Sequence, residues 1–191
     1  MQKNIDPHHL LVQVAEILDD LKVPYFITGG ISVLVWGRPR FTADIDVVVA
    51  LKPGNIVDLE KAIRKVSPNG YIDRDAMIEA LKQCGEFNFI EPNSGIKVDF
   101  WILSDSEFDK SRLKRRTKKK ILDKNVFFTS AEDLILIKLK WFKESESDRQ
   151  RADIESILKI TKQIDFSYLR TMAQKMNLLK VLEGILSDMS G

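Results

Sequence analysis

The pattern of apolar and polar positions divides the chain into a first part that mixes helices with strands and a second part that is helical throughout. Apolar side chains recur at helical spacing near the start of the chain and in every segment after residue 130. Short runs rich in β-branched and aromatic residues lie between the early helices and predict strands. We expect helices over residues 8–21, 31–36, 55–66, 74–84, 130–143, 147–161, 165–176 and 178–188, and strands over residues 23–28, 43–50, 87–90, 96–103 and, at a sheet edge, 125–129.

The order of these elements predicts a mixed α/β (α+β) fold, in which helices flank a mixed β-sheet and a helical extension follows it. We expect a sheet domain over residues 1–129 and a helical C-terminal region over residues 130–191 that packs on it. A chain of 191 residues is long enough to bury its own core. Its single cysteine, Cys84, excludes an intramolecular disulfide and a zinc site built from cysteines.

Composition and charge place the chain among ordinary globular proteins. Hydrophobic residues make up 44% of it and charged residues 30%, and the net charge of +2 indicates no particular partner. The first residues lack the apolar core of a secretory signal peptide, and no apolar stretch is long enough to cross a bilayer. We therefore expect a cytoplasmic protein that does not associate with membranes.

Two aspartates on one predicted strand, Asp44 and Asp46, are the strongest candidates for chemistry. Alternate side chains of a strand point to the same face, so these two carboxylates lie close together. At a separation of about 4 Å and an effective dielectric constant of about 20, two like charges repel by roughly 4 kcal/mol. A divalent cation bound between them relieves this repulsion, and Mg²⁺ prefers hard oxygen ligands of this kind. The pair therefore predicts a magnesium site.

The same spacing recurs at Asp73 and Asp75, but in a different context. The residues around that pair predict a turn and a helix start, without a β-branched run or a preceding glycine pair. We interpret these two aspartates as solvent-exposed charges at a helix N-terminus. Context, more than spacing, therefore distinguishes Asp44 and Asp46.

The residues that precede Asp44 strengthen its assignment. Gly29 and Gly30 lie between a strand and a short helix, where backbone N–H groups and the helix N-terminus favour a phosphate group. Arg40 and Thr42 then occupy alternate positions before the first aspartate. Together these residues predict a site for a phosphate-bearing ligand.

A third aspartate, Asp99, lies inside the apolar run VDFW at residues 98–101. A charge in such a run is costly unless it is paired or bound to a metal. Asp99 is therefore either a further metal ligand or half of a salt bridge, with Lys97 or Arg40 as its partner. The sequence leaves both alternatives open.

The segments that carry these residues resemble one known family. Gly29-Gly30, GRPRFTADID at residues 37–46 and VDFW at residues 98–101 are similar to motifs of the polymerase-beta-type nucleotidyltransferase superfamily. The resemblance is greatest to its small prokaryotic members, including AbiEii-like toxins of abortive-infection systems. The later segments SAEDLILIKLKWF and DRQRADIESIL resemble the family's C-terminal motifs, so the likeness covers most of the chain apart from its middle.

This resemblance implies a nucleotidyltransferase-type fold and an enzyme that transfers an NMP from an NTP to an acceptor hydroxyl and releases pyrophosphate. The acceptor would be a tRNA, a protein side chain or a small molecule. The resemblance implies that the catalytic residues Asp44, Asp46 and Asp99 bind Mg²⁺ or Mn²⁺, and that the nucleotide contacts Gly29, Gly30, Arg40, Thr42, Lys138, Arg149 (or Arg151) and Asp153. Many members carry Gly-Ser where this chain has two glycines, and Ser32 is the candidate replacement for that serine.

Several sequence features allow two interpretations each. The basic run from Lys110 to Lys120 is either a surface for RNA or a solvated helix or loop. Lys138 either reaches the nucleotide or extends its amine from an apolar helix to solvent, and Asp153 is either a site residue or a charge near a helix start. The alternative function is a catalytically silent toxin–antitoxin or regulatory module that binds an antitoxin or another protein.

Overall fold

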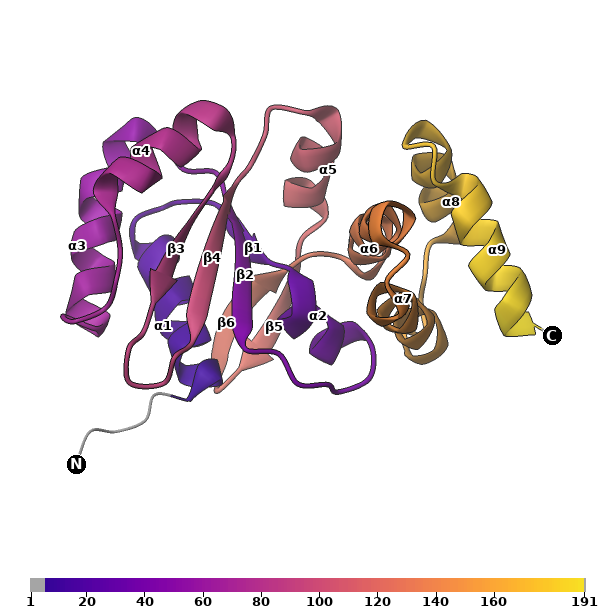
Figure 1. The fold of residues 1–191 in the computed structure, drawn as a ribbon, viewed down its shortest axis with the longest axis horizontal. Coiled ribbons are helices and arrows are strands. Elements are labelled where there is room, and N and C mark those ends of the chain that lie inside the picture. Colours follow the sequence, from indigo (N-terminus) through magenta and orange to yellow (C-terminus); the bar gives the residue numbers. More distant parts are fainter. Residues whose placement is uncertain (1–5, 191) are drawn as a thin grey trace. The chain divides into compact units, whose positions relative to one another are not determined.

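The computed structural model describes residues 6–190, which form two compact units (Figure 1). A sheet unit comprises residues 6–31 and Thr42–Thr129, and a helical unit comprises Ser32–Phe41 and residues 130–190. The boundary falls within helix α2 (Gly29–Trp36), whose first turn begins in the sheet unit. Over residues 6–190, none of the helices has the length and apolar character needed to span a membrane.

A mixed sheet of six strands, in the order β3-β4-β2-β1-β6-β5, forms the centre of the sheet unit within the described residues. Strands β2 and β4 pair in parallel, as do β1 and β6, and the other neighbours are antiparallel. The strands are β1 (Tyr25–Ile27), β2 (Asp44–Val49), β3 (Glu86–Ile90), β4 (Lys97–Ile102), β5 (Thr117–Ile121) and β6 (Lys124–Phe128). The mixed α/β class predicted from the sequence is confirmed.

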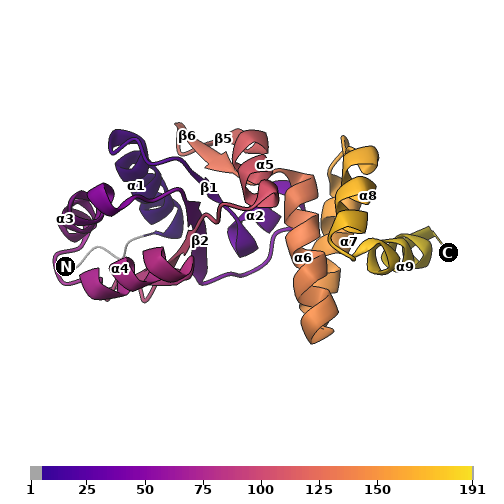
Figure 2. The ribbon, with the colours of Figure 1, turned by 90° about the horizontal axis from the view of Figure 1, so that it is seen from above.

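One face of this sheet is apolar and belongs to the core. Alternate residues of the paired strands β2 and β4 share that face, and these are all buried: Ile45, Val47, Val49, Val98, Phe100 and Ile102. The helices of the unit are α1 (Pro7–Asp20), α3 (Ile56–Val66, after a 3₁₀ turn at Pro53–Asn55), α4 (Arg74–Gln83) and α5 (Glu107–Arg115). Helix α4 contacts β3, α1 contacts β6, and Figures 1 and 2 show α3 and α4 side by side. The opposite face of β2 and β4 carries the polar residues Asp44, Asp46, Lys97 and Asp99, followed by the apolar pair Val48 and Trp101.

The helical unit contains α6 (Ala131–Ser145), α7 (Asp148–Ile160), α8 (Phe166–Lys175) and α9 (Leu179–Ser190). Helix α6 begins after Ser130, whose Oγ accepts a hydrogen bond of 3.1 Å from the backbone N–H of Asp133, as its sequence predicts. Its apolar residues Leu134, Ile135 and Leu139 are fully buried. All helices predicted after residue 130 are confirmed, with ends displaced by at most a few residues.

Two predictions about the segment before α6 need correction. The basic run was expected as a solvated helix or loop if it is not a surface for RNA. Its first part does lie in helix α5, but residues 117–120 belong to the strand β5. Strand β6 was expected at the sheet edge, but it lies between β1 and β5. Consecutive lysines in β5 hide the alternation that marks a strand, and charged lysines suit an exposed edge because they discourage pairing with other chains.

Candidate active site

The parallel pairing of β2 and β4 brings the three predicted catalytic aspartates to neighbouring positions. Asp46 is the register partner of Asp99, and Asp44 is the register partner of Lys97. Adjacent strands lie about 4.8 Å apart, and register partners share a face of the sheet. Asp44 lies on that face as well, because it is two residues before Asp46. The three carboxylates therefore share the sheet face opposite the apolar core.

The backbone of Gly29 lies directly against the carboxylate of Asp46. It has a positive φ of +61°, and a Cβ atom at this position would lie 1.8 Å from Oδ2 of Asp46. The backbone N–H of Thr28 donates a hydrogen bond of 2.9 Å to the carbonyl oxygen of Asp46. Helix α2 starts at Gly29, so its N-terminal N–H groups begin beside the carboxylates, where they favour an anion. Gly30, the second predicted phosphate contact, follows in the first turn and is buried.

Replacing Gly29 by alanine is expected to lower the free energy of unfolding by about 2–3 kcal/mol, because it adds a left-handed backbone penalty to a steric clash. The matched control is Gly95→Ala. Gly95 also has a positive φ, of +70°, but a Cβ there meets nothing within 4 Å. Urea unfolding should therefore show a clearly smaller loss for the control. If both variants lose the same free energy of unfolding, the close approach to Asp46 is not the reason that position 29 requires glycine.

Thr28 adds a hydroxyl to this face. It lies opposite Asp46 on the neighbouring strand, and its side chain is buried, with 7% of the residue exposed. Among the described residues its Oγ1 has no hydrogen-bond partner. Buried hydroxyls usually have a hydrogen-bond partner, so this one is suited to a ligand or a water molecule. Ser32, the replacement expected for the family's serine, is fully buried and belongs to the helical unit.

The donor set fits a hard divalent cation. Over residues 6–190, no three carboxylate, histidine or cysteine side chains are gathered into a ready-made metal cage. Mg²⁺ does not require one, because it is usually held by one or two carboxylates together with waters and substrate phosphates. Asp44 and Asp46 provide such a pair, and the unpartnered hydroxyl of Thr28 lies on the same face.

Lys97 gives Asp99 the salt bridge that the sequence left open as an alternative. Its Nζ lies 2.8 Å from Oδ2 of Asp99, and this hydrogen bond raises the pKa of Lys97. Asn88, on β3, is the register partner of Asp99 on its other side. Burial, and then the negative charges of Asp99 and Asp46, raise the pKa of the nearby Glu86. Sequence reasoning missed Glu86 and Asn88 as parts of this face, although their alternation along β3 is visible in the sequence.

In the helical unit, Arg40 and Lys138 both bind the buried carboxylate of Asp153. Arg40 donates from Nε to Oδ1 at 2.8 Å and from Nη2 to Oδ2 at 2.9 Å. Nζ of Lys138 lies 2.8 Å from Oδ2 of the same carboxylate. Burial alone would raise the pKa of Asp153, but the hydrogen bonds from Arg40 and Lys138 outweigh it and the pKa is lowered. The structure thus brings three of the predicted nucleotide-binding residues into one ion cluster.

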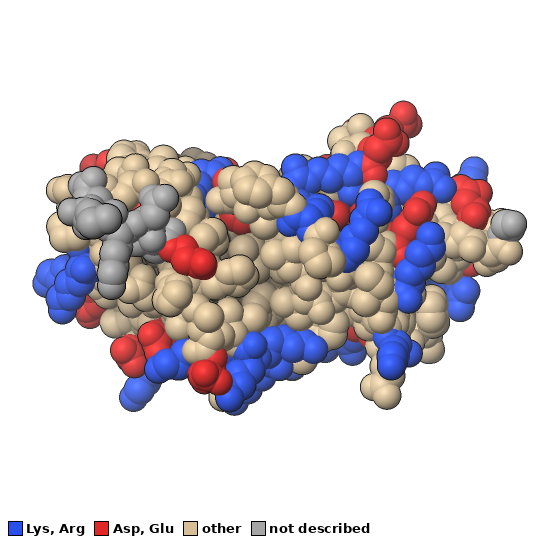
Figure 3. All heavy atoms as spheres, turned by 90° about the horizontal axis from the view of Figure 1, so that it is seen from below, with Lys and Arg blue, Asp and Glu red and all other residues tan. Residues whose placement is uncertain are grey.

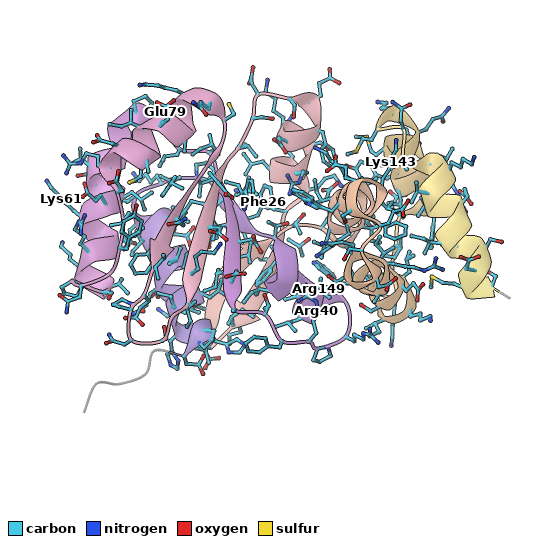
Figure 4. The ribbon with its side chains drawn as sticks, in the orientation of Figure 1. Phe26, Arg40, Lys61, Glu79, Lys143 and Arg149 are labelled. Carbon is cyan, nitrogen blue, oxygen red and sulfur yellow. The ribbon has the colours of Figure 1, made fainter. Side chains whose placement is uncertain are left out.

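The remaining predicted residues occupy simpler positions. Arg149 is exposed in the first turn of α7 and is labelled with Arg40 in Figure 4. Arg151, its alternative, forms ion pairs with Glu155 at 2.9 Å and Asp188 at 2.7 Å. Oγ1 of Thr42 lies 3.4 Å from the carbonyl oxygen of Asp44 in the sheet unit. Thr42 therefore contacts the backbone of Asp44 and not its carboxylate.

Much of the basic run is engaged in contacts within the sheet unit. The guanidinium of Arg112 is buried 4.8 Å from the ring of Phe26, a residue labelled in Figure 4. Arg116 lies over Phe127 in the same way, at 4.4 Å. Lys110 and Lys120 form ion pairs with acidic neighbours, at 2.7 Å and 2.9 Å. Figure 3 shows basic and acidic side chains interspersed on the face it draws.

Sequence comparison gives no relatives: neither a protein family nor a curated protein matches this chain. Solved structures do match. An antigenic nucleotidyltransferase-like protein from Paracoccidioides brasiliensis has a TM-score of 0.55 and 18% identity over 94% of this chain and 91% of its own. The antibiotic-resistance factor ANT(2")-Ia, in complex with adenylyl-2"-tobramycin, has a TM-score of 0.58 and 13% identity over 89% of this chain and 98% of its own.

The lincosamide antibiotic adenylyltransferase LnuA, with lincomycin bound, has a TM-score of 0.51 and 15% identity over 83% of this chain and all of its own, 100%. At such low sequence identity the similarity shows a shared fold and not a shared activity, because proteins with unrelated chemistries can have one architecture. Two of these matches cover 94% and 89% of this chain, so they extend over most of its mixed sheet and helices. The chain therefore has the nucleotidyltransferase fold.

Proposed function

We propose that this protein is a metal-dependent nucleotidyltransferase that transfers an NMP from an NTP to an acceptor hydroxyl. The observation that supports this most is the register of β2 and β4, which sets Asp46 beside Asp99 with Asp44 on the same face. Three carboxylates on one polar sheet face, next to the glycine-led start of a helix, form a site for a cation and a triphosphate together. The fold shared with nucleotidyltransferases agrees with this proposal.

In the proposed reaction, Asp44 and Asp46 would hold two divalent cations, Mg²⁺ or Mn²⁺, and Asp99 would hold the second of them and face the acceptor. A divalent metal held there would supply positive charge against the triphosphate and the departing pyrophosphate. Asp99 accepts the proton of the acceptor hydroxyl while the oxygen of that hydroxyl forms a bond to the α-phosphorus of the NTP. The bond between that phosphorus and the pyrophosphate oxygen breaks, so one NMP ester and one pyrophosphate are produced.

The backbone N–H groups of Gly29 and Gly30 are proposed to bind the phosphates at the start of α2. The hydroxyl of Thr28 is suited to a phosphate oxygen or a metal-bound water, since it otherwise has no partner among the described residues. Arg149, which is exposed in the helical unit, stays a predicted nucleotide residue. Lys138 and Asp153 stay predicted nucleotide residues, and their side chains here bind each other.

The acceptor is proposed to be a hydroxyl of a small molecule, a tRNA or a protein. ANT(2")-Ia and LnuA, which share the fold, were solved with an adenylylated aminoglycoside and with lincomycin. A small-molecule acceptor therefore has support from the neighbours' ligands, whereas RNA binding through the basic run has less, because Arg112 and Arg116 lie against aromatic rings. The AbiEii-like assignment and an antitoxin partner stay predictions from the sequence.

The test is a thermal-shift measurement with each of the four NTPs, with and without Mn²⁺. A ligand that binds only the folded state stabilises it by about 2.7 kcal/mol at a concentration of 100 times its Kd. We expect a marked rise in Tm for at least one NTP with Mn²⁺ and a smaller rise without the metal. Labelled NTP incubated with cell extract should then yield a labelled product. No shift with any NTP would contradict the proposal.

One observation favours the catalytically silent alternative. Lys97 pairs with Asp99, so the chain itself offsets part of the negative charge of this face. A silent module would give no labelled product with any of the four NTPs and would copurify with a specific protein partner. Labelled product without such a partner excludes this alternative.

A further inference from the structure

Lys97 stands where a divalent cation is expected to bind. It is the register partner of Asp44 and lies two residues before Asp99, so all of these side chains share one face. Its Nζ is 2.8 Å from Oδ2 of Asp99, and 40% of its side chain is exposed against 10% for Asp99. Its ammonium group therefore places a positive charge of the protein itself on the face that carries the three carboxylates.

We infer that Lys97 is a built-in counter-ion that competes with the divalent metal for Asp99 and thereby weakens the metal affinity of the site. The inference rests on the proposed function, because it concerns the same carboxylates. A metal that binds Oδ2 of Asp99 must displace the ammonium group from that oxygen. The flexible stem and partial exposure of Lys97 allow this displacement without a change in the backbone.

The competition gives Lys97 opposite effects on two measurable quantities. Without metal, its charge offsets the repulsion among Asp44, Asp46 and Asp99, so it stabilises the fold. With metal, the same charge opposes binding of the second cation. A lysine with a merely structural role would stabilise the protein in both conditions and would leave the metal affinity unchanged.

The test is Lys97→Met, which keeps the aliphatic stem and removes the charge, in the purified full chain without nucleotide. Titration calorimetry and the electron paramagnetic resonance of free Mn²⁺ give the Kd for the metal. We expect the variant to bind Mn²⁺ roughly two- to fivefold more tightly, the range for an exposed or half-exposed ion pair. Its Tm without metal should fall, and the rise in Tm on adding Mn²⁺ should be larger than in the wild type.

Three further variants complete the comparison. Lys97→Arg keeps the charge and should bind Mn²⁺ as the wild type does, and Lys97→Gln replaces the methionine variant if that variant does not fold. Lys120→Met is the matched control, because Lys120 lies on β5, where it pairs with Asp123, and three strands separate β5 from β4. Its Mn²⁺ affinity should not change.

The outcomes separate this inference from the proposed function. Tighter Mn²⁺ binding by the methionine variant, absent in the arginine and Lys120 variants, supports the inference. If the wild type binds Mn²⁺ and the methionine variant binds it equally or less tightly, the inference is overturned while the metal site stands. If neither protein binds Mn²⁺, the metal site of the proposed function is overturned, and the inference with it.

Discussion

An Asp46→Asn variant is expected to lose nucleotidyl transfer by at least about 10³-fold, or roughly 4 kcal/mol of transition-state stabilisation. Asp46 lies between the other parts of the site: it is paired with Asp99 across β2 and β4, and the backbone of Gly29 lies against its Oδ2. Asparagine has the same size but carries no charge, so the fold is retained while the cation loses a ligand. Transfer of labelled NMP from NTP into product is the direct measurement.

The chain contains its own control for this variant. Asp75 is the second aspartate of another D-x-D pair, but it is exposed in the first turn of α4, after Asp73 caps that helix at the N–H of Ala76. Asp75→Asn should leave both labelled product and the Mn²⁺–NTP thermal shift unchanged. In Asp46→Asn the same shift should disappear. A variant at Asp46 with an undiminished shift would refute the assignment of these carboxylates to a metal site.

The contrast between the two D-x-D pairs shows what the sequence could determine. Local signals sufficed to predict the secondary structure around each pair. The β-branched residues predicted the strand that carries Asp44 and Asp46, and the turn residues before Asp73 predicted a helix start. Alternation then fixed which side chains share a face. It could not fix that Asp46 is paired with Asp99, because strand pairing between segments more than fifty residues apart is decided by tertiary packing.

The parts that the sequence did not predict depend on long-range or non-periodic signals. Lys97 was one of two candidate partners of Asp99, and only the shared face of β4 identifies it. Arg40, the other candidate, instead binds Asp153, a residue 113 positions away. The strand β5 was missed because its lysines carry no apolar alternation, and the burial of Arg112 depends on the ring of Phe26.

An Asp153→Asn variant is expected to lower the free energy of unfolding by about 3–5 kcal/mol, as removal of one partner from a buried ion pair usually does. Asp153 is only 3% exposed and forms ion pairs with both Arg40 and Lys138, so the substitution removes a buried negative charge that two cations share. Urea unfolding followed by far-UV circular dichroism measures the effect. The matched control is Asp188→Asn, since Asp188 pairs with Arg151 but is 60% exposed. An exposed pair contributes about 0.2–1 kcal/mol, so the control should change little.

The dependence of this loss on pH identifies its cause. The pKa of Asp153 is held below its ordinary value of 3.8, so its carboxylate stabilises the fold most where the unfolded chain is also ionised, above that value. As the pH falls through the lowered pKa of the folded state, the carboxyl becomes protonated and its stabilising effect is lost. The difference between wild type and Asp153→Asn should therefore be full near neutral pH and should shrink in acid below 3.8. A difference that stays constant into acid would show that packing around the side chain, and not its charge, stabilises the helical unit.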